Sequence, residues 1–333
     1  MMWSTVGIHL EGIAISAYND ALVQDIGIEF QSDRLGSTTE GPWKPYRVVR
    51  TIEEAADTTY AFIVLATKCI PEVLPTEAIL SPLLSHISST PATSPTTIVL
   101  LQNGIGIEDK LLAYLASAND LDKRVAVVSG CAWVDATSVD GGRKVTQFGN
   151  ERLVLGAHKY DAGGLDGEKS LQEFCDILKQ AGANAVPVDD IDAARWRKVL
   201  WNASFSTICT LTRTNVGHVL ALQSGRDELA AIMHEVLTVA RASLSSTAAA
   251  ALPDTVVQDV INNENPKSVF KPSMLVDLEA GRPMEVEAIV GGVLRKAQTA
   301  KVHVPKLELI YTGLSLIQRQ ILETREKQSQ PLK

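Results

Sequence analysis

Residues 61–67 read AFIVLAT, residues 97–101 read TIVLL and residues 125–134 read VAVVSGCAWV. Each run is almost entirely apolar, which is typical of strands that are buried on both faces of a parallel sheet. Helix-like stretches at 75–85 and 108–116 separate the three runs. Strands that alternate with helices predict a doubly wound α/β sheet in the first part of the chain.

The pattern changes after about residue 190. Strand signals disappear, and four long segments carry apolar residues at helical spacing, at Ile191–Thr212, Arg226–Ser246, Met284–Lys301 and Lys306–Lys327. Such spacing predicts amphipathic helices that bury one face in a core. We therefore expect two domains, an α/β domain over 1–190 and an all-helical domain over 191–333.

The composition is that of an ordinary globular protein, because 45% of the 333 residues are hydrophobic and 21% are charged. The formal charge is −8 and the chain has no basic block, which argues against a nucleic-acid partner and against binding to anionic membranes. No apolar run reaches the ~18 residues of a membrane helix. The N-terminus lacks the features of a signal peptide, so we expect a cytoplasmic protein.

The four cysteines, Cys69, Cys131, Cys175 and Cys209, form no CxxC pair and stand mostly in apolar runs. In a chain of this length they indicate reduced core residues and not a disulfide framework. The six histidines are scattered, and none is paired at i+3 or i+4 with another His or a Cys. We therefore expect no metal site.

A doubly wound sheet that binds a dinucleotide carries Gly-x-Gly-x-x-Gly after its first strand, so that the backbone can approach the pyrophosphate. The first 30 residues contain only Gly7, Gly12 and Gly27, and this spacing does not fit. Gly104-Ile105-Gly106 follows a later strand, but the third position is Asp109, and its simpler interpretation is an Asn-Gly turn. We expect the first strand and the phosphate loop to be absent from this chain.

Polar residues follow two of the buried strands. Lys68 comes directly after the run at 61–67, and Asn103 follows the run at 97–101. The carboxyl ends of parallel strands meet at the crevice where such sheets bind ligands, so both side chains are candidates for one site. The alternative for Lys68 is a solvated lysine that follows a strand.

A second group of candidates stands at the start of the helical region, where residues 197–202 read RKVLWN. Lys198 and Asn202 are spaced i, i+4 and share one helix face. Leu200 and Trp201 make the surroundings apolar, which predicts a lowered pKa for the Lys198 amine and suits it to donate a proton near neutral pH. The alternative is a Lys–Asn pair on the surface of an amphipathic helix.

A third group lies in residues 273–287, which read SMLVDLEAGRPMEVE. Gly281 indicates the end of a helix, and Pro283 predicts the start of the next one. Glu285 would then lie in a first helical turn, where the helix dipole favours an acid for structural reasons alone. Ser273 has a structural alternative as well, since it could cap the helix that it precedes.

These segments together resemble the ketopantoate reductases. ATK at 66–68, LQNGIG at 101–106, KVLWN at 198–202 and SMLVDLEAGRPMEVE at 273–287 are similar to motifs of that family in order and spacing, and the resemblance runs from about residue 15 to about residue 320. WKP at 43–45 and the VVRTIEEAA that follows resemble the fungal-type branch.

The resemblance implies a Rossmann-like domain that binds NADPH, here N-terminally truncated, joined to a helical domain with the active site between them. It implies reduction of 2-dehydropantoate (ketopantoate) to pantoate in pantothenate biosynthesis. Lys198 would be the general acid, and Glu285 would anchor the substrate hydroxyl and order Lys198. A positioned proton donor of this kind contributes about 10²–10⁴ in rate.

The resemblance also implies binding residues. The residues expected to bind the keto acid are Asn202, Ser273, Asn103 and, by an approximate match, Asn215. The residues expected to contact NADPH are Lys68, Asn103 and Gly104. Whether the chain forms a homodimer is left open.

The sequence departs from the family pattern at several positions. Ser16 or Ala17 stands where an arginine would read the 2′-phosphate of NADP, and Val290 replaces an asparagine of the family. Loss of the phosphate loop would weaken NADPH binding by about 10²-fold or more. A truncated or mis-predicted N-terminus would explain this, and so would a catalytically impaired paralogue that acts as a binding protein. A reductase of another small 2-keto acid is a further alternative.

Overall fold

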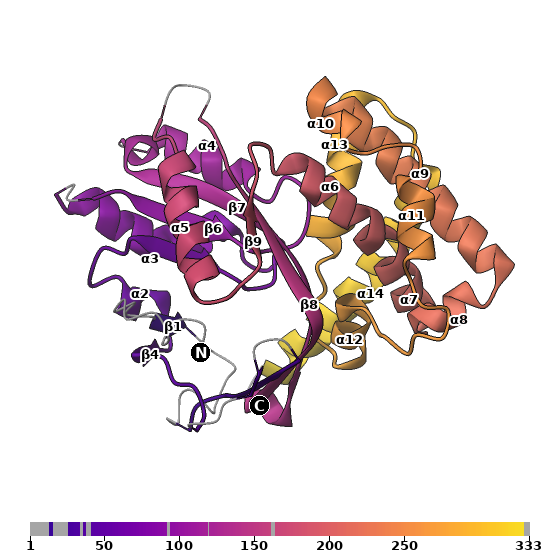
Figure 1. The fold of residues 1–333 in the computed structure, drawn as a ribbon, viewed down its shortest axis with the longest axis horizontal. Coiled ribbons are helices and arrows are strands. Elements are labelled where there is room, and N and C mark those ends of the chain that lie inside the picture. Colours follow the sequence, from indigo (N-terminus) through magenta and orange to yellow (C-terminus); the bar gives the residue numbers. More distant parts are fainter. Residues whose placement is uncertain are drawn as a thin grey trace. The chain divides into compact units, whose positions relative to one another are not determined.

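The computed structural model describes residues 13–15, 26–33, 36–37, 41–91, 94–118, 120–160 and 164–329. The chain divides into two compact units (Figure 1). Unit 1 comprises residues 1–66, 76–101 and 108–191, and unit 2 comprises residues 67–75, 102–107 and 192–333. The domain bounds 1–190 and 191–333 stay a prediction. Two short segments of the first predicted domain, 67–75 and 102–107, belong to unit 2.

Unit 1 contains a seven-stranded sheet with the order β3-β2-β8-β7-β6-β5, and β9 pairs with β8. The strands are β2 (Glu29–Ser32), β3 (Gly36–Ser37), β5 (Phe62–Leu65), β6 (Thr96–Leu100), β7 (Val125–Val139), β8 (Lys144–Ala157) and β9 (Ala185–Pro187). A separate parallel pair is formed by β1 (Ile13–Ile15) and β4 (Arg47–Val49).

The predicted α/β fold is confirmed. The three apolar runs form the neighbouring parallel strands β5, β6 and β7, and all five residues of β6 are buried. β8 runs antiparallel to β7, so the sheet is mixed beyond this parallel group. The helices that the structure describes in unit 1 are α2 (Ile52–Ala55), α3 (Thr76–Ser89), α4 (Asp109–Ser117) and α5 (Glu168–Gln180), with short 3-10 turns at Leu121–Lys123 and Asp140–Gly142.

One face of the sheet is covered by α5. Leu171, Phe174 and Cys175 of this helix belong to the same buried cluster as Val99 of β6 and Val128 of β7. Burial of these apolar side chains against the strands fixes the helix on the sheet.

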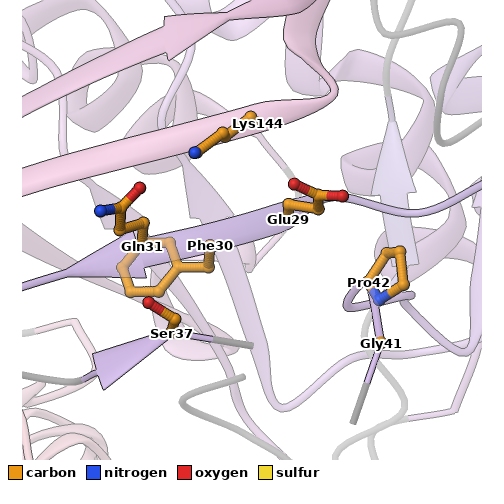
Figure 2. A pocket seen from close by; sticks show the side chains of 7 residues that line it. All are labelled: Glu29, Phe30, Gln31, Ser37, Gly41, Pro42 and Lys144. Atoms are coloured by element: carbon orange, nitrogen blue, oxygen red, sulfur yellow. The ribbon is translucent and has the colours of Figure 1, made fainter. Parts of the chain in front are cut away.

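The far halves of β7 and β8 leave this core. Residues 125–131 of β7 are buried, whereas residues 134–139 are exposed, and the register shifts between Trp133 and Asp135. We call residues 135–139 and 144–148 of these strands, with β2 and β3, the strand extension. A hollow of about 260 Å³ lies against it. Figure 2 shows the residues that line this hollow, which are Glu29, Phe30, Gln31, Ser37, Gly41, Pro42 and Lys144.

Every regular element that the structure describes in unit 2 is helical. In chain order these are α6 (Asp192–Trp201), the π-helix η3 (Asn202–Ser206), α7 (Thr207–Thr212), α8 (Val216–Leu220), α9 (Gln223–Ser243), α10 (Ser246–Ala250), α11 (Val256–Asn262), α12 (Ser273–Glu279), the π-helix η4 (Glu287–Gly291), α13 (Gly292–Ala300) and α14 (Pro305–Ser329). They share one large apolar core to which α9 contributes Ile232, Met233 and Val236.

The four predicted helical segments are confirmed, but one boundary is wrong. Gly281 ends α12 with a φ of +63°, as its position predicts. Pro283 does not begin the next helix, and Glu285 does not lie in a first turn, because helical backbone starts at Val286. Glu285 directly precedes the helix, and its carbonyl accepts the first helical bond from the Ile289 N–H at 3.1 Å. The preceding residue, Met284, is bonded on both sides to Gln318 of α14, whose side-chain oxygen accepts from the Met284 N–H at 2.8 Å and whose amide donates to the Met284 carbonyl at 3.0 Å.

Two expectations about the chain as a whole can be compared with the structure. None of the described helices has the length and the apolar character to cross a membrane. All four cysteines are buried, and none of them forms a disulfide bond. Gly7, Gly12, Ser16 and Ala17, on which the expectation of an absent phosphate loop and a missing arginine depends, lie outside the described residues.

Candidate active site

Two irregular segments of unit 2 follow neighbouring strands of the sheet. The β5 segment (67–75) comes after β5, and the β6 segment (102–107) comes after β6. Leu65 and Leu100 are partners in the parallel ladder, so the two strands end side by side. The amide of Gln102 donates to the hydroxyl of Thr67 at 3.3 Å and links the two segments.

Glu285 binds both segments. Its side chain is almost completely buried, with 3% of the residue exposed. Oε1 accepts from the Cys69 backbone N–H at 3.0 Å, Oε2 accepts from Asn103 Nδ2 at 3.1 Å, and Lys68 Nζ lies 3.6 Å from Oε2. A buried carboxylate is tolerated only where donors and a cation compensate for the lost water. Glu285 therefore holds Lys68 and Asn103, which were predicted separately, around one carboxylate.

Asp277 of α12 is a second buried carboxylate beside the first. Its Oδ2 lies 2.6 Å from Lys68 Nζ, and its Oδ1 accepts from Arg282 Nε at 3.1 Å. Lys68 thus stands between the carboxylates of Asp277 and Glu285, with 40% of its side chain still exposed. Two cations and two carboxylates balance one another here, and the expected contact of Lys68 with the cofactor stays a prediction.

The backbone of the β6 segment packs against the helix that follows Glu285. Gly104 has a φ of +114°, and a Cβ added there would lie 2.4 Å from the Ala288 carbonyl oxygen. The Ile105 N–H donates to that same oxygen at 3.0 Å, and a Cβ on Gly292 would lie 2.4 Å from the Ile105 carbonyl. Glycine is required at Gly104 by its backbone conformation and by this close approach.

Lys198 and Asn202 stand where α6 changes into the π-helix η3. Lys198 is half-buried and Asn202 is buried, with 9% exposure. Single π-helical turns are rare and occur frequently at functional sites. The backbone is fixed there by Ser204, whose hydroxyl donates to the Leu200 carbonyl at 2.6 Å. The role of Lys198 as proton donor and the lowering of its pKa stay predictions.

Ser273 and Asn215 are placed differently. Ser273 is the exposed first residue of α12, and Pro272 occupies the cap position, so the capping explanation for Ser273 is wrong. Asn215 caps α8, because its side-chain oxygen accepts from the His218 N–H at 2.9 Å. Its predicted contact with the substrate stays a prediction. Val290, which replaces an asparagine of the family, is fully buried in η4.

Metal binding and thiol chemistry have little support in the described part of the chain. No group of three or more His, Cys, Asp or Glu side chains that could hold a metal ion is found there. Burial raises the pKa of the Cys209 thiol to about 12 and also raises the pKa of Cys175. Such thiols remain protonated at neutral pH and are poor nucleophiles.

Three residues of the site were missed from the sequence, namely Asp277, Gln318 and Arg195, whose guanidinium donates to the Gln102 and Gly104 carbonyls. Arg195 precedes Lys198 by three residues and Asn202 by seven, so a count along the helix face would have found it. Asp277 follows Ser273 by one helical turn and could have been found in the same way. Gln318 has no local signal, although its amide also donates to Glu72 of the β5 segment at 2.8 Å.

Comparison with known proteins identifies one family over most of the chain. The family described as Ketopantoate reductase PanE/ApbA matches residues 16–160, and its C-terminal part matches residues 190–318. An uncharacterised protein of Saccharomyces cerevisiae is 28% identical over 85% of this chain and 80% of its own length. A 2-dehydropantoate 2-reductase of Mesorhizobium japonicum is 26% identical over 95% of this chain and 89% of its own, whereas the match to the Nostoc enzyme, at 23% identity, covers 66% of this chain and 65% of that enzyme.

Solved structures show the same fold. The 2-dehydropantoate 2-reductase from Methylococcus capsulatus is 27% identical, with a TM-score of 0.73 over 99% of this chain and 94% of that chain. The enzyme from Geobacter metallireducens has a TM-score of 0.77 at 23% identity, covering 95% and 94% of the two chains. A D-mandelate dehydrogenase solved with NADH and anilino(oxo)acetate has a TM-score of 0.73 at 20% identity, covering 96% and 94%.

Proposed function

We propose that this chain, which belongs to the ketopantoate reductase family, reduces 2-dehydropantoate to pantoate with NADPH. The observation that carries the proposal is the buried carboxylate of Glu285, which gathers Lys68, the Cys69 backbone and Asn103 in the unit that also contains Lys198 and Asn202. The family match does not favour the alternative of an impaired binding protein.

The described residues fit the nicotinamide end of the cofactor. Asn103 donates to Glu285 through its amide nitrogen, and its amide oxygen has no donor among the residues that the structure describes. That oxygen can accept from a carboxamide such as the one on nicotinamide. Gly104 is required by its packing against Ala288, so its glycine alone is no argument for a phosphate contact. The choice of NADPH over NADH stays a part of the proposal, since residues 16–25 are not described.

The reaction needs a hydride at the keto carbon and a proton at the keto oxygen. When bound, the cofactor supplies the hydride. Lys198, as an ammonium, stabilises the negative charge that grows on the oxygen and then transfers a proton to it, after which the amine regains a proton from solvent. Asn202, one turn further along the same helix, hydrogen-bonds the substrate through its side-chain amide. The hydroxyl of Ser273 forms a second hydrogen bond with the substrate.

Glu285 acts in this scheme by holding other groups. Both of its oxygens already accept hydrogen bonds from the chain, and a cation stands nearby. It therefore keeps Asn103 and the β5 segment in place and need not itself exchange a proton. The ordering of Lys198 by Glu285, and the contact of Glu285 with the substrate hydroxyl, remain parts of the proposal.

A substrate panel tests the function. We expect NADPH oxidation with 2-dehydropantoate at a kcat/KM at least about tenfold above that with other branched 2-keto acids or with arylglyoxylates, because a site built to hydrogen-bond a hydroxyl rejects analogues that lack it. Turnover of a different keto acid without turnover of 2-dehydropantoate would show that the substrate assignment is wrong. No oxidation of NADPH or NADH with any keto acid would remove the reductase assignment itself.

The cellular role and the assembly are tested separately. A cytoplasmic step of pantothenate biosynthesis predicts that the chain restores growth of a strain lacking 2-dehydropantoate 2-reductase on medium without pantothenate. A ketopantoate reductase from Staphylococcus aureus that is described as dimeric is 22% identical and has a TM-score of 0.62. This supports a homodimer, and light scattering at micromolar concentration should give twice the chain mass.

A further inference from the structure

We propose that Arg195 is a positioning residue whose buried guanidinium grips the backbone on both sides of Asn103 and thereby holds the Asn103 amide on Glu285. The inference deepens the proposed function, since it assigns a role at the same site, and the part that concerns activity rests on that function. In this proposal Arg195 binds backbone carbonyls and acts through Asn103, without touching the substrate or the cofactor itself.

The contacts of Arg195 are specific to the β6 segment. The residue lies in α6 and is 2% exposed. Its Nη1 donates to the carbonyl oxygens of Gln102 and Gly104, each at 3.2 Å. These two carbonyls flank Asn103, whose amide nitrogen reaches Glu285 Oε2 at 3.1 Å. One nitrogen of the guanidinium therefore fixes the two peptide groups between which the Asn103 side chain emerges.

The opposite support of the same segment comes from η4. The Ile105 N–H donates to the Ala288 carbonyl at 3.0 Å, and Gly104 touches that residue. The β6 segment is thus held from α6 through Arg195 and from η4 through Ala288. Without Arg195, the segment would keep the η4 contacts and its side-chain bonds to Thr67 and Glu285, but the two peptide groups that flank Asn103 would lose the guanidinium that fixes them.

Arg195 also fixes the position of the Asn103 amide relative to Lys198, the proposed proton donor. It precedes Lys198 by three residues and Asn202 by seven, a spacing that places all three on one helical face. The helix that carries Lys198 and Asn202 therefore holds the β6 segment directly. A shift of about 1 Å between the groups that position the substrate and the proton donor can lower the rate by up to about 10²-fold.

Stability alone does not explain this residue. Nε and Nη2 of Arg195 are buried without a hydrogen-bond partner in the described part of the chain, and so is the side-chain oxygen of Gln102. No described carboxylate forms a salt bridge with the guanidinium. A buried cation that is matched only by neutral carbonyls costs more in desolvation than it returns, and apolar replacements of such groups are often neutral or stabilising. A group kept at this cost is better explained by a geometric role.

Hydrogen exchange tests the positioning directly, whatever the activity. We compare Arg195→Met with Arg197→Met, a control that makes the same change at an exposed position of the same helix. In Arg195→Met the Ile105 amide, which is bonded to the Ala288 carbonyl in the middle of the 102–107 segment, should exchange at least about tenfold faster, while the amides of α9 keep their protection and Tm is unchanged or higher. Arg197→Met should leave all of them unchanged. Unaltered exchange at Ile105 in Arg195→Met, or a loss of protection throughout unit 2, would overturn the proposal.

Activity supplies the second readout. Arg195→Met should lower kcat by about tenfold or more with a smaller change in KM, and in an Asn103→Ala background the same substitution should lower kcat by less than about twofold, because both changes remove one function. If the losses of kcat in the two single variants add up in the double variant, Arg195 does not act through Asn103. A wild-type protein that reduces no keto acid would defeat the proposed function, while the exchange experiment would still decide the positioning.

Discussion

Two charged regions of the molecule differ in almost every physical respect. The two carboxylates of the Glu285 site in unit 2 are 4–5% exposed, and both lie within 4 Å of a cation. The hollow on the strand extension of unit 1 is open, and its charged residues Glu29 and Lys144 form no salt bridge with any described residue (Figure 2). In the first region the carboxylates are buried and paired, whereas in the second Glu29 is exposed and Lys144 is half-buried.

The difference teaches that buried charge is a better guide to function here than surface shape. Exposed charges cost little and contribute little, so their presence beside a hollow carries no chemical information. Two buried carboxylates, in contrast, persist only where several donors converge, and the convergence of Lys68, Cys69 and Asn103 on Glu285 is specific. Matched substitutions in the two regions test this interpretation.

The largest effect is expected from Glu285→Ala. The change leaves Lys68, the Cys69 N–H and the Asn103 amide without their common acceptor, and breaking a buried charge network costs about 3–5 kcal/mol. Thermal unfolding should show Tm lowered by roughly 10 °C. The matched change Glu29→Ala at the exposed hollow should stay within about 0.5 kcal/mol. Should Glu285→Ala fail to fold, Glu285→Gln keeps an acceptor and the volume, and must still lose activity.

Lys198→Ala should lower turnover at least about a hundredfold with little change in Tm, because a positioned proton donor is lost from a half-buried site. Steady-state kinetics with 2-dehydropantoate measure this. Lys144→Ala, which removes a lysine from the hollow, should change kcat less than about twofold. A tenfold or smaller loss in Lys198→Ala would mean that another group supplies the proton.

Gly104→Ala and Gly41→Ala compare two glycines with similar backbone conformations, since their φ angles are +114° and +100°. A Cβ on Gly104 would meet the Ala288 carbonyl at 2.4 Å, whereas a Cβ on Gly41 meets nothing within 4 Å. In both variants the positive φ destabilises the folded state by about 1–2 kcal/mol, but only Gly104→Ala must also displace neighbouring backbone. Chemical denaturation should therefore show Gly104→Ala to be the less stable by at least about 1 kcal/mol. Equal losses would contradict the close approach.

The smallest effect is expected from Glu264→Gln and depends on pH. Burial raises the pKa of Glu264, although its hydrogen bond from Trp201 Nε1 at 2.7 Å partly opposes this. The folded state therefore favours the protonated acid, so stability is highest below the unfolded pKa and falls as pH rises through the raised one. The amide keeps the acceptor for Trp201 and carries no charge, so Tm at pH 7 should rise by roughly 1–2 °C above wild type and match it near pH 4. A constant difference between pH 4 and pH 7 would exclude this cause.

Much of the fold could be predicted because its signals are local. A continuous apolar run reports burial on both faces, and β5, β6 and β7 lie where such runs occur. Helical periodicity located the long helices of unit 2 for the same reason. The strand extension was not predicted, because residues 134–139 lack an apolar pattern and are ordered by pairing with β8.

The candidate site was predictable only where chemistry coincided with the end of an element. Lys68 and Asn103 follow strands, and Lys198 and Asn202 share a helical turn, so a list of candidates could be drawn from the sequence. The motif at 273–287 gave Glu285 its place by resemblance, with a wrong helix start.

The sequence by itself determined which segments become buried strands and which become amphipathic helices, because the spacing of apolar residues is set before the chain folds. Only the tertiary structure decided that helical backbone starts after Glu285, that Gln318 holds Met284, and which groups Arg195 and Asp277 bind. These facts depend on partners such as Gln318, 34 residues from Met284, and Lys68, 209 residues from Asp277. A buried polar group is defined by whatever partner packing brings to it, and that partner leaves no trace in the local sequence.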